Sequence, residues 1–413
     1  MRCAARFDGE SLIDGPATVL ISGGIIAGVE PGHPDLGADV EVIDLGEATV
    51  LPGLIDTHVH LVTDSVPNAL DLVEDYSDQQ IDAVVDRALA AHLAAGVTTV
   101  RDLGDRRFAV VDRRDRQRRG SSTGSSTGPA SGPEPTILAA GPPLTSPRGH
   151  CWYLGGEVDG PTEIELALAE RIERRVDVVK VMASGGMATT GTDVMRPQFT
   201  LDELRLIVDL AHDAGLPVTA HAHALAAVEI AVAAGVDGLE HCSCLTPQGP
   251  RMPPELLTVL AARQIPIGAA LMAAPPASFD QAPPNIKKVL AQLGVTPEQM
   301  LELRRAAAGR MHAAGVRFVG GSDAGINDFM AHGQMRSGLE FLVSAGATVP
   351  QGLAAGTSLA AQACGLGDRK GFLRLGYDAD LVAVDGRFGS DLTPLGRVRQ
   401  VVLGGAFVAT GAR

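Results

Sequence analysis

Short apolar runs alternate with longer amphipathic stretches along most of the chain. Apolar runs of this length, separated by helical stretches, are typical of repeated βα units around a parallel sheet. Eight runs are predicted to be β-strands: "GLIDTHVHL", "TTVRDL", "TILAAG", "DVVKVMAS", "PVTAHAH", "GLEHC", "IPIGAAL" and "RFVGGSD". Eight such units over roughly 300 residues fit a (β/α)8 barrel, which needs about 250 residues.

The clearest helix is predicted for residues 200–215, "TLDELRLIVDLAHDAG". Thr200 and Glu203 have the spacing of a capping box, in which each side chain bonds the backbone N–H of the other residue. Gly215 and Pro217 then end the helix, because proline does not continue a helix and glycine commonly follows its last turn. One stripe of the helix is apolar: Leu201, Leu204, Val208 and Ala211.

Both ends of the chain have a different pattern. Residues 1–49 and 370–413 contain short apolar runs broken by glycines and no good amphipathic helix. Because chain termini often lie close together, these segments are predicted to form one small β-sandwich domain, with residues 50–369 inserted as the barrel. The predicted fold is therefore α/β, a (β/α)8 TIM barrel with a small β-sandwich domain built from both termini.

Two segments interrupt the βα pattern. The insertion at 106–135 begins with an arginine-rich stretch and continues as a Ser/Gly-rich repeat typical of a flexible loop. The arginines could form a nucleic-acid arm, but the interleaved aspartates favour a solvated helix. The second interruption, 273–284, follows the seventh predicted strand, and its pattern fits a lid and a plain surface loop equally well.

Composition narrows the class of protein. The chain has a formal net charge of −15 and only 3% aromatic residues, which disfavours nucleic acids and anionic membranes as partners. No run reaches the roughly 18 apolar residues of a membrane helix, and the N-terminus lacks a leader pattern. We expect a cytoplasmic protein that acts on a small molecule, alone or as a homo-oligomer.

His58 and His60 lie one residue apart in the first predicted strand. Side chains two positions apart on a strand point to the same side, so the two imidazoles could share one metal ion. With 11 histidines in the chain, however, one such pair is close to what chance supplies. The pair alone fits a metal site and two core histidines equally well.

Polar residues near the ends of other predicted strands strengthen the metal interpretation: Lys180, His221, His241 and Asp323. Each lies in an otherwise apolar run, where an unpartnered polar group is costly to bury. The C-terminal ends of barrel strands meet at one mouth, so a shared site would supply the partners. Lys180 could pair with a buried carboxylate; alternatively, a neutral amine there could take up carbon dioxide and become a carbamate that bridges two cations.

Six segments resemble, in the same order, the motifs of the amidohydrolase superfamily: "LPGLIDTHVHL", "VKVMASGG", "VTAHAHA", "GVDGLEHC", "GGSDAG" and "KGFLRLGYDADLVAVD". Within it, they look like the imidazolonepropionase-related, prolidase-like branch, which includes Xaa-dipeptidases, ochratoxinase and phenylurea hydrolases. The resemblance covers essentially the whole chain. The insertion at 106–135, between the second and third strands near the expected pocket entrance, departs from that branch.

The resemblance implies a binuclear metal centre. His58, His60 and Asp323 would bind the inner ion, His221 and His241 the outer one, and Lys180, carboxylated at N6, would bridge both. A hydroxide held between the two divalent metal ions would attack the amide carbonyl, while Asp323 moves the proton to the leaving nitrogen. Zn2+ suits such ligands best, with manganese, iron and cobalt left open.

Further residues could contact the substrate. His223 shares the face of His221, and His150 in "SPRGHCW" matches a segment where the branch often has a histidine; simple packing is the alternative for both. Arg148 and Arg196 are candidates to pair with a substrate carboxylate. Gly185 and Gly186 either let the backbone approach the substrate or merely turn the chain.

Three functions are compatible with these residues. The first is a hydrolase of an amide C–N bond, as in a dipeptide or an N-acyl amino acid. The second is a hydrolase or deaminase of a cyclic amide, urea or heteroaromatic C–N bond on the same barrel. The third, a metal-binding protein without catalysis, is disfavoured because all six positions of the implied site are present.

Overall fold

The structure is a computed structural model that describes residues 1–123, 133–270 and 284–408. A β-strand lies at each of the eight predicted positions. Their bounds are β5 (Leu54–Val59), β6 (Val97–Asp102), β7 (Thr136–Ala139), β8 (Val179–Met182), β9 (Val218–Ala224), β10 (Gly238–Thr246), β12 (Ile267–Gly268) and β13 (Phe318–Val319). The apolar runs alone were sufficient to predict these strands, because strands that are buried on both faces consist mostly of apolar residues.

The eight strands form two parallel ladders. One has the order β5-β6-β7 and the other β8-β9-β10-β12-β13, with the short β11 (Gly249–Pro250) antiparallel to β10. Isolated parallel bridges, Leu144 with Val181 and Val59 with Ala324, connect the two ladders at both ends. The fold is therefore α/β with parallel sheets, and the strands succeed one another in chain order.

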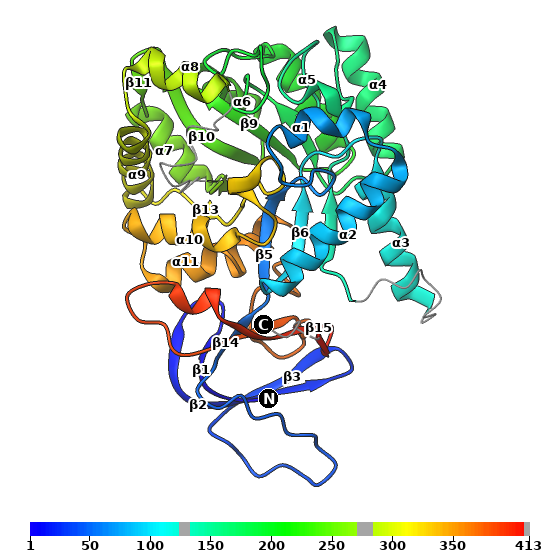
Figure 1. The fold of residues 1–413 in the computed structure, drawn as a ribbon, viewed down its shortest axis with the longest axis vertical. Helices are drawn as coiled ribbons and strands as arrows, with labels where there is room; N and C mark the ends of the chain where they lie inside the picture. The colour runs from blue at the N-terminus through cyan, green and yellow to red at the C-terminus, as the bar shows by residue number, and fades with distance from the viewer. Residues whose placement is uncertain (124–132, 271–283, 409–413) are drawn as a thin grey trace.

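The helices surround the parallel strands (Figure 1). Their bounds are α1 (Ala69–Leu72), α2 (Asp78–Ala94), α3 (Ala109–Thr123), α4 (Gly160–Glu173), α5 (Leu201–Asp213), α6 (Leu225–Ala234), α7 (Pro254–Arg263), α8 (Pro284–Leu293), α9 (Pro297–Ala313), α10 (Met335–Ser344), α11 (Val349–Ala355) and α12 (Ser358–Ala363). The capping box of α5 is confirmed, with Glu203 N donating to Thr200 Oγ1 at 3.3 Å and Thr200 N to Glu203 Oε2 at 2.8 Å. None of the helices in the described ranges combines the length and the apolarity needed to span a bilayer.

Strands from both ends of the chain form a third sheet of seven strands at one end of the molecule (Figure 1). Its order is β16 (Ala406–Val408), β15 (Val398–Leu403), β14 (Leu381–Val384), β4 (Thr49–Pro52), β1 (Arg2–Phe7), β2 (Leu12–Ser22) and β3 (Ile25–Pro31). The sheet has a buried cluster of its own, which includes Val19, Val50 and Leu381. The predicted division into domains and the sandwich form stay predictions.

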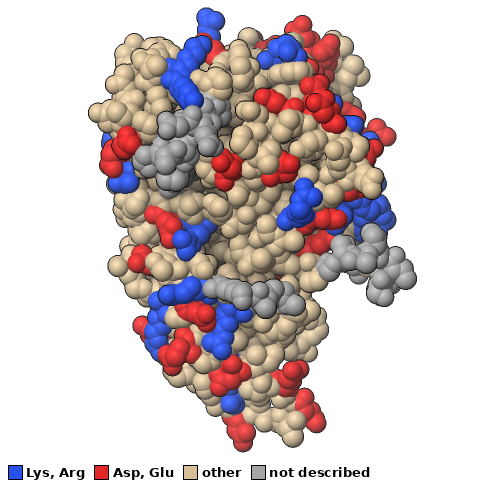
Figure 2. Space-filling view, in the orientation of Figure 1, with Lys and Arg blue, Asp and Glu red and all other residues tan. Residues whose placement is uncertain are grey.

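The arginine-rich stretch forms helix α3, as predicted, but it is not fully solvated. Arg114 is only 1% exposed in the side chain because Asp177 and Asp115 lie 2.8 and 2.7 Å from its guanidinium. Arg113 is likewise buried, beside carboxylates of other elements. On the face in Figure 2, basic and acidic side chains are interspersed. Residues 124–132 of the Ser/Gly-rich repeat and 273–283 of the second interruption lie outside the described residues.

Candidate functional site

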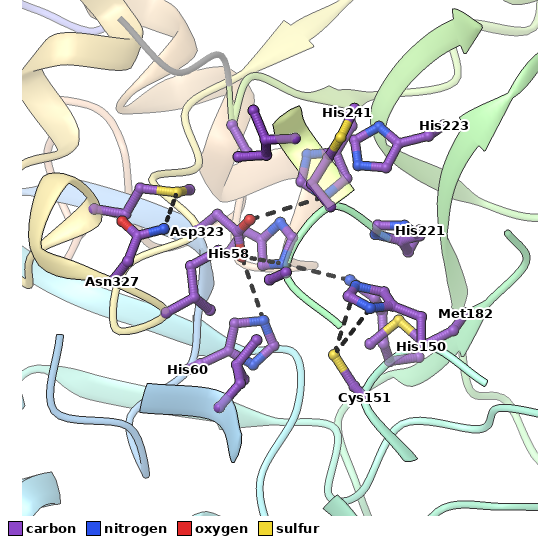
Figure 3. Close-up of a pocket in the computed structure, with 18 of the residues that line it drawn as sticks. His58, His60, His150, Cys151, Met182, His221, His223, His241, Asp323 and Asn327 are labelled. Atoms are coloured by element: carbon purple, nitrogen blue, oxygen red, sulfur yellow. Dashed lines mark hydrogen bonds and ion pairs between the residues drawn. The ribbon is translucent and has the colours of Figure 1, made fainter. Parts of the chain in front are cut away.

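One cavity of about 590 Å3, partly open to solvent, lies at the ends of the parallel strands (Figure 3). The structure brings every residue of the predicted site to its wall: His58, His60, His150, Lys180, His221, His223, His241 and Asp323. All of these side chains are buried. They come from β5, β8, β9, β10 and the segments after β5, β7 and β13, so strands far apart in sequence converge on one place.

The potential ligand atoms form two groups. Those of His58, His60 and Asp323 lie within 4.8 Å of one another, and so do those of His221, His223 and His241. Ligand atoms this close together could hold one cation in each group after small side-chain adjustments. The two groups could therefore hold two ions. The second group contains His223 as well as the two predicted ligands of the outer ion.

Asp323, a member of the first group, also faces a histidine of the second. Its Oδ1 atom is 3.2 Å from His58 Nε2 and 3.3 Å from His60 Nε2, and its Oδ2 atom is 3.9 Å from His241 Nε2. Asp323 has a φ of 54°, in the left-handed region that side chains rarely adopt. This strained backbone holds the carboxylate where it faces both groups of histidines.

Lys180 projects from β8 with its Nζ atom 3.4 Å from His58 Nε2. Burial lowers the pKa of the Lys180 ammonium group, which favours the neutral amine. Within the described part of the chain, no carboxylate lies at ion-pair distance from Nζ. The alternative in which Lys180 is simply half of a structural ion pair therefore has no support.

Although burial lowers the pKa of His60, the hydrogen bond and the charge of Asp323 raise it above its usual value. Burial sets the protonation of the other imidazoles. It lowers the pKa of His150 and of His241 to about 3, and it lowers the pKa of His58, His221 and His223 as well. These side chains are consequently neutral at physiological pH. A neutral imidazole has the free lone pair that binds a metal cation, so the histidines fit divalent metal ions.

Glu240 is a site residue that the sequence analysis missed. Its Oε2 atom is 3.0 Å from His58 Nδ1, and its Oε1 atom accepts hydrogen bonds from Thr219 Oγ1 at 3.0 Å and Arg101 Nη2 at 3.3 Å. The signal was present, since a carboxylate inside the apolar run "GLEHC" is as costly to bury as Lys180. In a regular strand, however, neighbouring side chains point to opposite faces, so Glu240 is expected to face away from the side on which His241 lies.

The backbone of β10 explains why both neighbours face the interior. His241 has a φ of 66° and Cys242 a φ of 47°, and the pairing of β10 with β9 shifts register after His241. Left-handed residues interrupt the alternation of a strand and re-aim its side chains. His241 can therefore line the cavity directly after Glu240.

His150 is held within the cavity wall. Its Nδ1 atom lies 2.8 Å from Thr189 Oγ1, and its ring is 4.4 Å from the ring of His221. A Cβ atom on Gly186 would lie 2.2 Å from the His150 ring, and one on Gly185 would lie 2.3 Å from the carbonyl oxygen of Asp193. The two glycines thus make room for protein atoms rather than for the substrate.

Neither arginine predicted to pair with a substrate carboxylate lines the cavity. Arg148 is exposed, with its guanidinium 3.4 Å from the centre of the Trp152 ring, and Arg196 is also exposed. Arg304 of α9 lines the cavity instead. The described part of the insertion at 106–135 contributes no residue to the wall of the cavity.

Parallel strands that carry buried histidines, a lysine and an aspartate into one cavity define the chain as an α/β enzyme. The sequence model of the Amidohydrolase family matches residues 49–408. The chain belongs to the amidohydrolase family.

Individual relatives match parts of the chain or its fold. Ochratoxinase from Aspergillus niger is 36% identical over 102 residues, which are 24% of this chain and 21% of that protein. Imidazolonepropionase from Salinispora tropica is 25% identical over 256 residues, 56% of this chain and 58% of its own length. The structure of a Xaa-Pro dipeptidase with bound methionine superposes with a TM-score of 0.82 at 24% identity, covering 98% of both chains, and thus shares the fold.

Proposed function

We propose that this chain is a metal-dependent amidohydrolase that cleaves the C–N bond of a dipeptide, an N-acyl amino acid or a related amide. The observation that carries the proposal is the pair of ligand groups in one cavity, each with its ligand atoms within 4.8 Å of one another, with Asp323 of the first group facing His241 of the second. Six metal-binding side chains so close together and so deeply buried have few structural roles, because unpartnered polar groups are costly to bury.

The residues fit two divalent metal ions. His58, His60 and Asp323 would hold the inner ion, His221 and His241 the outer one, and Lys180 would bridge both after N6-carboxylation. Nitrogen and oxygen donors of this kind suit Zn2+, and also manganese, iron or cobalt. When bound, the ions supply Lewis acidity for the carbonyl oxygen and lower the pKa of a water molecule.

The chain's own residues perform the proton transfer and the positioning. Asp323 would accept a proton from the attacking water and donate it to the leaving nitrogen, so that the amine departs uncharged. His150 and His223 would contact the substrate from the same wall. Apolar side chains such as Met187, Ile326 and Met330 line the rest of the cavity and limit the access of competing water.

We also propose that the two parallel ladders are halves of one (β/α)8 barrel. The isolated β-bridges between Leu144 and Val181 and between Val59 and Ala324 support this, because they join the segments that follow the third and eighth strands to the fourth and first strands. The small β domain would then comprise residues 1–49 and 370–413. An active site at the C-terminal ends of barrel strands is the usual arrangement in such enzymes.

Elemental analysis and amide hydrolysis test the proposal on the Zn2+-loaded chain. We expect about two metal ions per chain and release of a free amine from dipeptides or N-acyl amino acids. His58→Ala should lose metal and activity. The control His212→Ala should keep both, because that histidine is 42% exposed on α5 and bonds Asp237 at 2.8 Å. A metal-replete protein that cleaves no amide, urea or lactam would refute the proposal.

The match to imidazolonepropionase favours one second candidate, hydrolysis of a cyclic C–N bond. Ring opening gives a single product, whereas deamination releases ammonia and cleavage of an open amide releases an amine and an acid. A product analysis on lactams, hydantoins and open amides separates the two candidates.

A further inference from the structure

Arg304 lies on α9 between two cavities. It lines the histidine cavity, and it also lines a neighbouring cavity of about 520 Å3, partly open to solvent, whose wall includes His241, Arg251 and Arg310. Arg304 also contributes, after burial and His241, to the lowered pKa of His223, so its charge is close to that imidazole. The guanidinium is therefore part of the wall that a bound substrate would meet.

The guanidinium of Arg304 lacks a partner in the described part of the chain. Among residues 1–123, 133–270 and 284–408, none accepts a hydrogen bond from its guanidinium or forms an ion pair with it. Other interior arginines differ, since Arg101 contacts Glu240 at 3.3 Å and Arg114 contacts Asp177 at 2.8 Å. Burial alone lowers the pKa of Arg304, yet a guanidinium stays protonated at neutral pH.

Carboxylates are scarce around Arg304 among the described residues. Asp323 is the only carboxylate among the residues described as lining either cavity, and it lies beside His58 and His60. A partly desolvated cation without a counter-charge is unfavourable, and a bound anion would remove that cost.

We propose that Arg304 is a specificity-determining residue that binds a carboxylate of the substrate. The inference rests on the proposed amide hydrolysis and selects, within it, amides that carry a carboxylate, as dipeptides and N-acyl amino acids do. The planar fork of a guanidinium matches a carboxylate with two parallel hydrogen bonds. The apolar part of the substrate would pack on Met187, Ile326 and Met330, which line the same cavity.

The probes are N-acetyl-L-methionine and its C-terminal carboxamide, which differ only in the charged group. Calorimetry on the full chain measures the binding of each probe, and a hydrolysis assay of the metal-loaded protein measures KM and kcat. The variants are Arg304→Met, which removes the charge, and Arg304→Lys, which keeps the charge without the fork. Arg305→Met is the matched control, because Arg305 is on the same helix, contacts Glu302 at 2.9 Å and lines neither cavity.

We expect Arg304→Met to weaken binding of the carboxylate probe, and to raise its KM, by about tenfold to hundredfold. Its kcat and the binding of the carboxamide should change by less than about threefold, because neither depends on the lost charged hydrogen bonds. Arg304→Lys should lie between wild type and Arg304→Met, and Arg305→Met should match wild type. Acetate and phosphate should compete only weakly, since they lack the apolar part.

The outcomes separate this inference from the proposed function. If the wild-type protein cleaves amides but binds both probes alike, or if Arg304→Met binds the carboxylate as wild type does, the role of Arg304 is refuted and the proposed function stands. If binding depends on Arg304 but no amide is cleaved, the carboxylate site stands and the proposed function fails. Acetate or phosphate binding as tightly as the carboxylate probe would show a free-anion site and overturn the substrate role.

Discussion

The Nδ1 atom of His58 lies 3.0 Å from the Oε2 atom of Glu240, and both side chains are 1% exposed. The contact turns the other ring nitrogen, Nε2, toward Asp323 at 3.2 Å and Lys180 at 3.4 Å. A carboxylate on one imidazole nitrogen fixes the ring orientation and raises the basicity of the other nitrogen. Glu240 therefore positions His58 for its proposed role as a ligand.

Glu240→Gln is expected to weaken metal binding by about tenfold to hundredfold, because loss of such an outer carboxylate commonly has this effect. Competition with a chromophoric chelator measures the metal affinity. Glu229→Gln, an exposed change on α6, is the control and should leave the affinity unaltered. Equal metal affinity in Glu240→Gln and wild type would contradict a positioning role.

Asp323→Asn should lower kcat by about 10²- to 10⁴-fold, because the amide neither accepts the proton of water nor donates it to the leaving nitrogen. Steady-state kinetics should be paired with elemental analysis, since Asp323 also lies within ligand distance of His58 and His60. Loss of activity with metal still bound would assign the proton transfer to this carboxylate. A variant that keeps wild-type kcat would exclude it.

Lys180 provides a test of the bridging group. Under conditions that preserve a carbamate, the mass of the wild-type chain should exceed the sequence mass by one carbon dioxide. Lys180→Ala should lack this increment and bind less metal, because the bridging carboxylate is absent. Lys288→Ala, an exposed change on α8, should retain both. An unmodified wild-type chain that binds two ions normally would rule out carboxylation.

The sequence predicted the strands and the proposed ligands because both have strong local signals. A polar residue that ends an apolar strand, such as Lys180 or Asp323, is conspicuous in the sequence itself. Glu240 was missed because the φ of 66° at His241 breaks the alternation on which strand faces are predicted. Arg304 was missed because helix periodicity does not reveal that α9 borders the cavity; that follows only from tertiary packing.

The capping box of α5 was predicted from local spacing, and its contribution to the stability of the protein can be measured. Thr200→Ala should lower the free energy of unfolding by about 1 kcal/mol, because the backbone N–H of Glu203 loses its acceptor. Urea unfolding measures the change. Thr200→Ser keeps a hydroxyl acceptor and should stay close to wild type. If serine and alanine destabilise the chain equally, the hydrogen bond to the hydroxyl is not the source of the effect.

Asp105 is expected to make stability fall as the pH rises. Burial, with a smaller contribution from Asp102, raises the pKa of this carboxyl from 3.8 to about 7 in the folded chain. Between these values the folded state holds a proton that the unfolded state has released, so the stability contributed by this group is complete below about pH 4 and is lost as the pH rises through about 7.

Asp105→Asn should remove this dependence, because an amide does not ionise and its oxygen still accepts from the backbone N–H groups of Val110 and Val111, as Asp105 does at 2.9 and 3.3 Å. Relative to wild type, the variant should therefore be more stable at pH 8 than at pH 4, by up to about 4 kcal/mol. Asp56 also has a pKa raised to about 7 by burial, so only the difference between the two proteins isolates Asp105. Urea unfolding at both pH values measures it, with the exposed Asp209→Asn as control. Parallel pH profiles for wild type and Asp105→Asn would show that Asp105 does not titrate in this range.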